Sequence, residues 1–314
     1  MKFTIALAPM AGYTDLSFRR IASRYGMDYA TTEMVSVKAL YYGDKKTKRL
    51  MAVAEDEAPV GLQLFGEDPA ILEQVLADLS ESGGLDAFAF VDLNMGCPAP
   101  KIVKTGAGSA LMRDLPRAKA MMEAAVKASS VPVTVKVRKG FLEGETQGFE
   151  IAKIAQDAGI SALTVHGRSR EAYYSGLADW DFIGRVSNAV TIPVIGNGDI
   201  ARAEDIAHAR DYGVAGVAIG RGVIGNPFLF RDCKRFLLGE DPLPISDAEI
   251  LRVAKTHLAW SVAQKGERLG VVEMRKHFIG YLKGFPGAKK LRAEILSLAT
   301  EAEILKFLDA IPVE

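Results

Sequence analysis

Cysteine is scarce in this chain, which has 314 residues and only two cysteines, Cys97 and Cys233. Small proteins held together by disulfides need several cysteines at short spacings, so two distant ones exclude that class and favour a reducing compartment. No apolar run approaches the roughly 20 residues of a membrane-spanning helix. We therefore predict a cytoplasmic protein that does not cross a membrane.

Net charge is also lacking, because 39 Lys and Arg balance 39 Asp and Glu. Composition as a whole therefore gives no indication of an anionic partner. Apolar residues, in contrast, make up 49% of the sequence, which is enough to build a sizeable core. A chain of this length accommodates one large α/β domain with an appendage.

Short apolar, β-branched runs alternate with longer segments of helical period. Eight parallel strands with crossover helices, completed by about residue 238, fit a (β/α)8 TIM barrel, and a doubly wound open sheet is the alternative. Asp68 and Asp114 stand where helix N-caps are expected. The expected strands are 3–8, 29–33, 60–65, 88–94, 131–137, 162–166, 192–196 and 216–220, and the expected helices are 16–25, 69–82, 116–128, 149–158, 180–189 and 203–212.

A proline-containing linker over 239–244 separates this pattern from an all-helical tail over 246–312. We expect two domains, a catalytic barrel over 1–240 and a small helical domain over 245–314.

Basic residues dominate the stretch 252–292 of the tail, where ten of them stand against two acidic ones, a net charge of +8. A charge run is usually only a solvated face. Here His277, Phe278, Tyr281 and Phe285 lie among the charges, and this combination suits contact with phosphates and bases.

Cys97 lies in the segment NMGCPAP, directly after the apolar run 88–93. The glycine and prolines predict a turn without regular structure, and a flexible, basic loop is expected over 101–109. A lone cysteine is often a small buried apolar residue. A thiol at an exposed loop tip among hydrogen-bond donors is, however, where reactive cysteines are found.

Other unusual residues fall at the C-terminal ends of the predicted strands, which in a barrel meet on the face that carries the active site. Lys136 is the strongest case, because a lysine among β-branched residues must be neutralised, paired or bound to an anion. A lone histidine such as His166 is more often structural. The strand-end residues are Pro9, Met10, Ala11, Gly12, Gln63, Asn94, Cys97, Lys136, Arg138, His166, Gly167 and Arg168.

Glycine loops at 196–199 and 220–222 follow the last two predicted strands, where barrels hold a phosphate. Residues 220–225 also match the dinucleotide pattern G-x-G-x-x-G, with Glu240 at about the expected distance. We reject that interpretation because the motif follows the last strand and Glu240 lies in the linker. A mononucleotide phosphate is favoured, although spacing alone does not separate FMN from a phosphorylated substrate.

These segments together resemble the tRNA-dihydrouridine synthases over essentially the whole chain. DLNMGCP at 92–98, continuing to GAGS at 106–109, is similar to that family's signature around its catalytic cysteine. Six segments are similar to its FMN-contacting segments, and the tail resembles its helical tRNA-binding domain. The six are PMAG at 9–12, QLFG at 63–66, VKVR at 135–138, HGR at 166–168, NGD at 197–199 and GRG at 220–222; the tail carries RKH at 275–277, Tyr281, KG at 283–284, PGA at 286–288 and LR at 291–292.

The resemblance implies a barrel with FMN that reduces the C5–C6 double bond of uridine in tRNA, with NADPH as the usual electron source. It implies that hydride passes from the flavin to C6 while Cys97 gives a proton to C5. Cys97 would then be a general acid without a lowered pKa. Lys136 would stabilise negative charge on the reduced flavin with His166 nearby, and Gln63 would hydrogen-bond the ring.

The same resemblance implies the remaining site residues, and it implies that the uridine is flipped out of the folded RNA into the barrel mouth. It implies neither a metal nor an obligate protein partner. The flavin ring would pack on Pro9, Met10 and Ala11, its phosphate would bind at Asn197, Gly198, Asp199, Gly220 and Arg221, uridine would meet Asn94, Arg138 and Arg168, and tRNA would meet Arg275, Lys276, His277, Tyr281 and Lys283.

Two other functions remain open from the sequence. One is a FMN barrel that acts on a free pyrimidine, such as a dihydroorotate dehydrogenase, which has no need of a basic helical tail. The other is a non-catalytic RNA-binding protein on a degenerate barrel, which the presence of Cys97, Lys136 and both glycine loops argues against.

Overall fold

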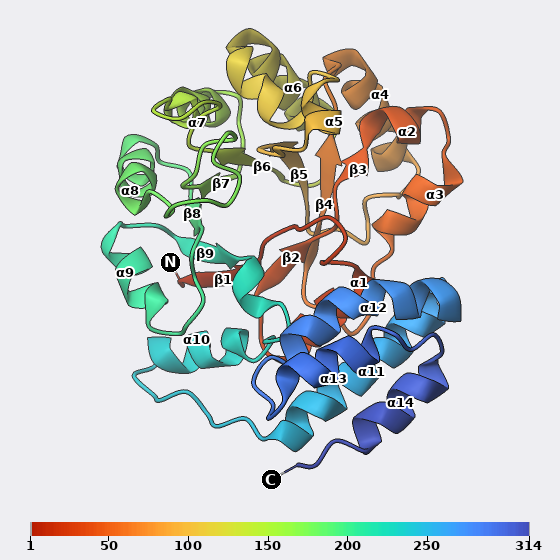
Figure 1. Ribbon diagram of the computed structural model, residues 1–314. Helices are drawn as coiled ribbons and strands as arrows, with labels where there is room; N and C mark the ends of the chain where they lie inside the picture. Colours follow the sequence, from red (N-terminus) through yellow and green to blue (C-terminus); the bar gives the residue numbers. More distant parts are fainter. Residues whose placement is uncertain (1, 314) are drawn as a thin grey trace.

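A closed barrel of parallel strands forms the centre of the computed structural model, which describes residues 2–313 (Figure 1). The strand order is β2-β1-β9-β8-β7-β6-β5-β4, and pairing of β2 with β4 closes the ring. The short β3 pairs with the end of β4 and was not predicted. The predicted TIM barrel is confirmed. Its strands are β1 (Thr4–Leu7), β2 (Tyr29–Thr31), β3 (Val35–Ser36), β4 (Val60–Phe65), β5 (Phe90–Met95), β6 (Val133–Arg138), β7 (Ala162–His166), β8 (Val194–Asn197) and β9 (Gly216–Ile219).

Helices surround the barrel at each predicted position. Asp68 accepts hydrogen bonds from the backbone N–H groups of Ala70 and Ile71, and Asp114 accepts one from Arg117, so both predicted N-caps are confirmed. The helices are α1 (Leu16–Arg24), α4 (Pro69–Glu81), α6 (Leu115–Ala128), α7 (Gln147–Asp157), α8 (Trp180–Ala189), α9 (Asp205–Asp211) and α10 (Leu229–Leu237).

Short helices interrupt several expected loops. The loop expected over 101–109 instead contains α5 and leads into η2, because Pro100 sits in the first turn of α5, where its missing N–H is not needed. Gly108 adopts a φ of +60°, and a Cβ there would lie 3.1 Å from the Cβ of Cys97, so a larger residue would be strained and crowded where η2 approaches the Cys97 segment. The short elements are α2 (Val37–Tyr41), α3 (Lys45–Lys48), η1 (Arg49–Met51), α5 (Pro100–Val103), η2 (Gly108–Arg113) and η3 (Arg221–Val223).

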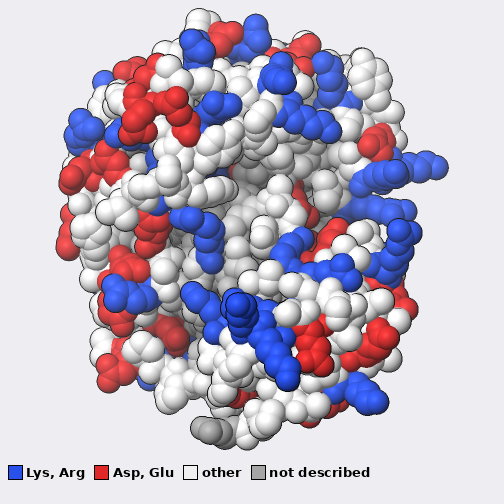
Figure 2. All heavy atoms as spheres, viewed as in Figure 1, with Lys and Arg blue, Asp and Glu red and all other residues white. Residues whose placement is uncertain are grey.

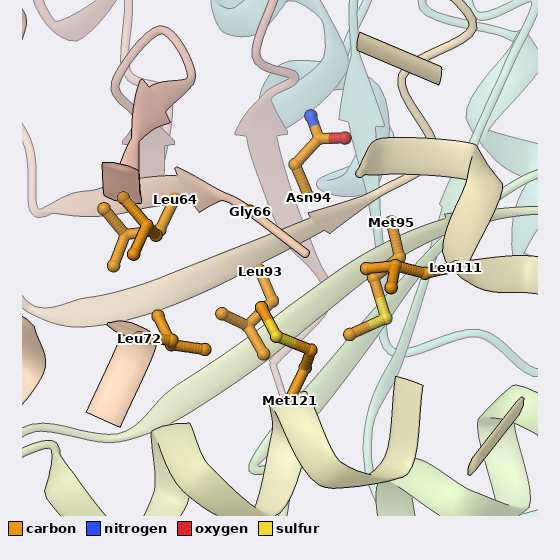
Figure 3. Close-up of a pocket in the computed structure, with 9 residues that line it drawn as sticks. Leu64, Gly66, Leu72, Leu93, Asn94, Met95, Leu111 and Met121 are labelled. Carbon is orange, nitrogen blue, oxygen red and sulfur yellow. The ribbon is translucent and has the colours of Figure 1, made fainter. Parts of the chain in front are cut away.

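Side chains of β5 alternate between the two faces of the barrel wall. Leu93 and Met95 point outward and pack with Leu72 of α4 and Met121 of α6, and the gap between them is too small for a water molecule (Figure 3). Asn94 points the other way, away from these apolar side chains (Figure 3). The outer face of β5 is therefore core, and its inner face carries the polar residues.

The C-terminal helices form a second apolar core and pack against α1. Figure 1 shows them in blue at one side of the barrel. Ile21 of α1 and Phe228 join this core, so the tail is attached to the barrel by apolar packing. Within 2–313, no helix is both long and apolar enough to span a bilayer. The tail helices are α11 (Asp247–Lys265), α12 (Glu267–Tyr281), α13 (Ala288–Ile295) and α14 (Glu301–Asp309).

Candidate active site

A cavity of about 1060 Å³ opens at the C-terminal ends of the strands. Figure 2 shows a hollow on this face with Lys and Arg around its rim. Parallel strands end on one side of a barrel, so residues far apart in sequence converge there. Every site residue predicted in the barrel lines this cavity, together with one from the tail: Pro9, Met10, Ala11, Gln63, Asn94, Cys97, Lys136, Arg138, His166, Arg168, Asn197, Gly198, Asp199, Gly220, Arg221 and Lys283.

Cys97 is half-buried in the wall of the cavity and is not at an exposed loop tip as expected. Its backbone N–H donates to Asn94 Oδ1 at 2.9 Å, and its carbonyl accepts from the N–H of Ser109 at 3.2 Å. Burial raises the pKa of the thiol above its ordinary value, and the nearby cations Arg138 and Lys136 offset this only in part. The thiol is therefore protonated at neutral pH.

Lys136 reaches the cavity from β6 and is held by one hydrogen bond, from Nζ to Asn197 Oδ1 at 3.0 Å. No carboxylate of residues 2–313 lies within 4.0 Å of this ammonium group. Burial and the nearby cation Arg138 together lower the pKa of Lys136 to about 8, against the opposing effect of Asp92. A cation in this position is suited to receive negative charge from a bound ligand.

Arg168 joins the loops that follow β7 and β8. Its Nη2 donates to both carboxylate oxygens of Asp199, at 2.7 and 2.8 Å, and to the carbonyl of Gly176, while its Nε donates to the carbonyl of Ser175. Protein acceptors therefore occupy Nε and Nη2, and Nη1 lies 3.4 Å from His166 Nε2. Next to it, burial and the surrounding cations lower the pKa of His166 well below its ordinary value, so this imidazole is neutral at pH 7.

Arg138 is buried and has much of its donor capacity satisfied by protein. It donates to the carbonyl of Gly96 at 2.9 Å, and to those of Ser169 at 2.8 Å and Tyr173 at 2.9 Å. Burial lowers its pKa to about 10. The side chain that was expected to meet the uracil therefore ties the Cys97 segment to the loop after β7.

Gln63 and Asn94 bind each other across β4 and β5. Asn94 Nδ2 donates to Gln63 Oε1 at 3.0 Å, and Gln63 Nε2 donates to Asp92 Oδ2 at 2.7 Å. Each amide group keeps one N–H that these bonds do not use. Both residues line the cavity, and Asn94 Nδ2 also lies 4.0 Å from the sulfur of Met34.

The glycine loops after β8 and β9 lie on the opposite wall of the cavity. Gly198 has a φ of +130°, and a Cβ there would lie 2.5 Å from that of Ala178, so no other residue fits. The carboxylate of Asp199 is bound by Arg168, by the N–H of Ala178 and, at 3.4 Å, by Arg221, and it would repel a phosphate. Only its backbone suits the predicted phosphate site, whereas the half-exposed Arg221 offers a cation.

Lys283 is the one predicted tail residue at the cavity. Helix α12 reaches this place because two glycines bring the chains together. A Cβ on Gly225 would lie 2.2 Å from the carbonyl carbon of Gly280. The tail therefore contributes directly to the mouth of the barrel.

The other predicted tail residues are not among those that line the cavity. His277 and Tyr281 are buried. The Tyr281 hydroxyl lies 3.1 Å from Nδ1 of His257, and the centres of the His257 and His277 rings are 4.5 Å apart. Arg275 donates to the carbonyl of Leu298, and Lys276 lies 5.2 Å from the centre of the Tyr13 ring. The burial of His277 and Tyr281 leaves neither side chain at a surface where RNA could touch it.

Several lining residues escaped the sequence analysis, and Tyr174 is the clearest. The residue is 51% exposed, and the centre of its ring lies 4.8 Å from the guanidinium carbon of Arg221 and 5.7 Å from that of Arg138. The signal in the sequence is an aromatic pair at 173–174 in the loop after β7. Tyr13, Met34, Tyr173 and Asn226 were missed in the same way.

Comparison with known proteins gives a consistent result. The model of a family described as dihydrouridine synthase (Dus) matches residues 6–314. The tRNA-dihydrouridine synthase B of Shewanella oneidensis is 38% identical over 305 residues, covering 96% of this chain and 93% of the relative. A probable tRNA-dihydrouridine synthase of Rickettsia bellii is 39% identical over 295 residues, covering 93% and 89%. A probable tRNA-dihydrouridine synthase 1 of Synechocystis sp. is 39% identical over 305 residues, covering 96% and 84%.

Proposed function

Since this chain belongs to the dihydrouridine synthase family, we propose that it reduces the C5–C6 double bond of uridine in tRNA at the barrel mouth. The observation that carries this proposal is that a protonated thiol and an ammonium group line the same cavity. Cys97 and Lys136 both line it, and the tail borders it through Lys283. The barrel over 1–240 would carry the chemistry, and the helical domain over 245–314 would bind the RNA.

FMN is the cofactor we propose, with NADPH as the electron donor, and the residues present suit it. When bound, the flavin would supply the electrons for the reduction. Lys136 offers an ammonium group with a single partner, Gln63 offers an unused N–H, and Ala8, Met10 and Ala11 provide an apolar wall. The glycine loop at Gly198 and the cation of Arg221 suit the phosphate.

Cys97 is the general acid in this proposal. Its thiol proton would be transferred to C5 of the uracil, and the thiolate would then take a proton from solvent. The raised pKa of the thiol supports this role, because the proton must stay on sulfur until the substrate arrives. A nucleophilic cysteine would need the opposite shift.

The tRNA would be held by basic side chains of the tail, and its uridine would be flipped into the cavity. Lys283, Lys289 and Lys290 are exposed, and within residues 2–313 no carboxylate pairs with any of the three. Arg292 is half-buried and binds the carbonyl of Ala288 only through Nε. Because tRNA is the substrate, we expect the protein to act in the cytoplasm.

A direct test uses purified protein and tRNA from cells that lack dihydrouridine synthases. We expect denatured protein to release FMN, and we expect the native protein with NADPH to add two hydrogens to uridine in that tRNA, as seen by mass spectrometry. A protein that neither releases nor takes up flavin would contradict the proposal. Reduction of a free pyrimidine without reduction of tRNA would favour the dihydroorotate dehydrogenase-like alternative.

A further inference from the structure

A buried carboxylate, Asp92, lies inside the barrel below the cavity, and the proposed reaction gives it no role. It sits on β5 with Gln63 of β4 and Thr134 of β6 as its neighbours in register. Its Oδ2 accepts from Gln63 Nε2 at 2.7 Å, and its Oδ1 accepts from Thr134 Oγ1 at 2.6 Å. Only 3% of the residue is exposed, so this carboxylate meets protein and not solvent.

A continuous chain of hydrogen bonds leads from Asp92 to the Cys97 segment. Gln63 binds Asp92 through its nitrogen and accepts from Asn94 Nδ2 through its oxygen, at 3.0 Å. Asn94 Oδ1 in turn accepts from the backbone N–H of Cys97 at 2.9 Å and of Gly96 at 3.3 Å. Each side chain in this series is held by a hydrogen bond to the next one towards Asp92.

The two ends of the chain require the same orientation of both amide groups. Backbone N–H groups can only donate hydrogen bonds, so Asn94 Oδ1 has to accept and its Nδ2 donates to Gln63. Burial raises the pKa of Asp92, but its Oδ2 can accept from Gln63 Nε2 whether or not Oδ1 carries a proton. Turning the amide of either Gln63 or Asn94 would bring like groups face to face. Asp92 is therefore the anchor that keeps Gln63, and through it Asn94, in the orientation that the Cys97 segment needs.

We propose that Asp92 is a positioning residue for the thiol, acting through Gln63 and Asn94. The proposal extends the proposed function, in which Cys97 is the proton donor. A proton donor must be held at a fixed place relative to its acceptor, and a short loop needs support from the layer below to achieve this. Without the carboxylate, the buried N–H of Gln63 loses its acceptor, and Gln63 turns towards the cavity and releases Asn94.

A charge effect on Lys136 is the alternative explanation for Asp92, because the two groups attract each other. Two substitutions separate the explanations. In Asp92→Asn, the new side chain still accepts from Gln63 and donates to the hydroxyl of Thr134, which turns to accept, so the chain survives without the charge. In Asp92→Leu, both the chain and the charge are lost.

The rate at which iodoacetamide alkylates Cys97 in the isolated flavoprotein measures the position of the thiol independently of catalysis. A Cys233→Ala background removes the second thiol, which is buried. We expect Asp92→Leu to speed alkylation on the order of tenfold, as for the loss of one buried hydrogen bond, and to shift its pH profile towards an ordinary thiol. Asp92→Asn should stay close to wild type.

Thr134→Val is the matched control, because it removes the other hydrogen bond of the same carboxylate and leaves the chain intact. Its alkylation rate should also stay close to wild type. Asp92→Leu in an Asn94→Ala background should add little, because the chain is already broken. Should Asp92→Leu fail to fold, Gln63→Met breaks the next link and must give the same acceleration.

Alkylation at the wild-type rate in folded Asp92→Leu, or in Gln63→Met, overturns the proposal. Equal acceleration in Asp92→Asn and Asp92→Leu also overturns it, in favour of the charge. The proposed function fails separately: if alkylation follows the prediction but Cys97→Ala still forms dihydrouridine at the normal rate, Asp92 positions the thiol and the thiol is not the acid.

Discussion

The barrel mouth and the C-terminal helices both carry the polar residues that the sequence singled out, yet they place them differently. At the mouth, all predicted residues converge on one cavity, whereas in the tail only Lys283 reaches it and His277 and Tyr281 are buried. The C-terminal ends of parallel strands all lie on one side of a barrel, so a residue that follows a strand in the sequence is placed at the mouth. In a helix, a residue is buried or exposed according to the face on which it lies, and aromatic residues interleaved with charges can lie on either face.

Two half-buried lysines show the same difference in their electrostatics. Lys136 at the mouth has no carboxylate partner in the described part of the chain, residues 2–313, and burial lowers its pKa to about 8. Burial alone would also lower the pKa of Lys265 in the tail, but Asp15 and Glu273 outweigh it and raise the pKa. The tail lysine is part of the attachment to α1, and the lysine at the mouth is positioned for a ligand.

The largest effect should come from the two cysteines, one in each kind of environment. Cys97→Ala removes the proposed acid, and we expect dihydrouridine formation in tRNA to fall on the order of 10²- to 10⁴-fold. Cys233→Ala changes a buried thiol far from the cavity and should leave turnover close to wild type. Similar losses of turnover in both variants would show that the cysteine at the mouth has no role that the buried cysteine lacks.

Loss of the tail lysine should affect stability and not chemistry. Lys265→Met leaves the buried carboxylate of Asp15 without its partner, at a cost of about 3 kcal/mol or more in the free energy of unfolding. Lys255→Met, on the same helix, breaks only a partly exposed pair with Asp309 and should change little. Urea denaturation measures both, and equal stabilities would show that the Asp15 pair does not attach the tail.

Charge reversal on the tail surface tests whether it binds RNA. Lys283→Glu, Lys289→Glu and Arg292→Glu together should weaken tRNA binding and flatten its log–log salt dependence by about 0.9 for each phosphate that the variant no longer neutralises. His277→Phe alters a buried ring and serves as the control, with an unchanged salt slope. An unchanged slope in the triple variant would show that these three side chains face solvent and do not bind tRNA.

The pH dependence of FMN binding to the flavin-free protein should give the smallest effect. Lys136 loses its charge as pH rises above its pKa of about 8, so the affinity for FMN should fall by at most about tenfold per pH unit above that value. Cys97 does not account for this limb, because burial raises its pKa. In Lys136→Arg the charge persists, and a limb that stays at the same pH would exclude Lys136 as its source.

Most of the barrel and its site could be predicted because periodicity locates strands and strands locate their ends. The sequence could not predict which hydrogen-bond partners each polar side chain has in the folded protein. Arg138 and Arg168 were expected to meet the substrate, but neighbouring loop carbonyls occupy much of their donor capacity. Those loops are far away in sequence or have no regular pattern, so only the folded chain reveals how the two side chains are bound.

Local rules also failed where tertiary packing decides. Two prolines near Cys97 predicted irregular structure, yet Pro100 begins α5. Tyr174 lies in a loop with no periodicity, and only its position after β7 brings it to the cavity. His277 and Tyr281 pack inward because α12 buries that face against α11 and α1.

The central claim is that the thiol of Cys97 protonates a uridine of tRNA during its reduction, and single-turnover kinetics test it most directly. Wild type and Cys97→Ala are first reduced with NADPH without oxygen, and then mixed with tRNA that lacks dihydrouridine. We expect equal reduction by NADPH, followed by flavin reoxidation that is at least about 10²-fold slower in the variant. Reoxidation of the variant at the wild-type rate would contradict the claim.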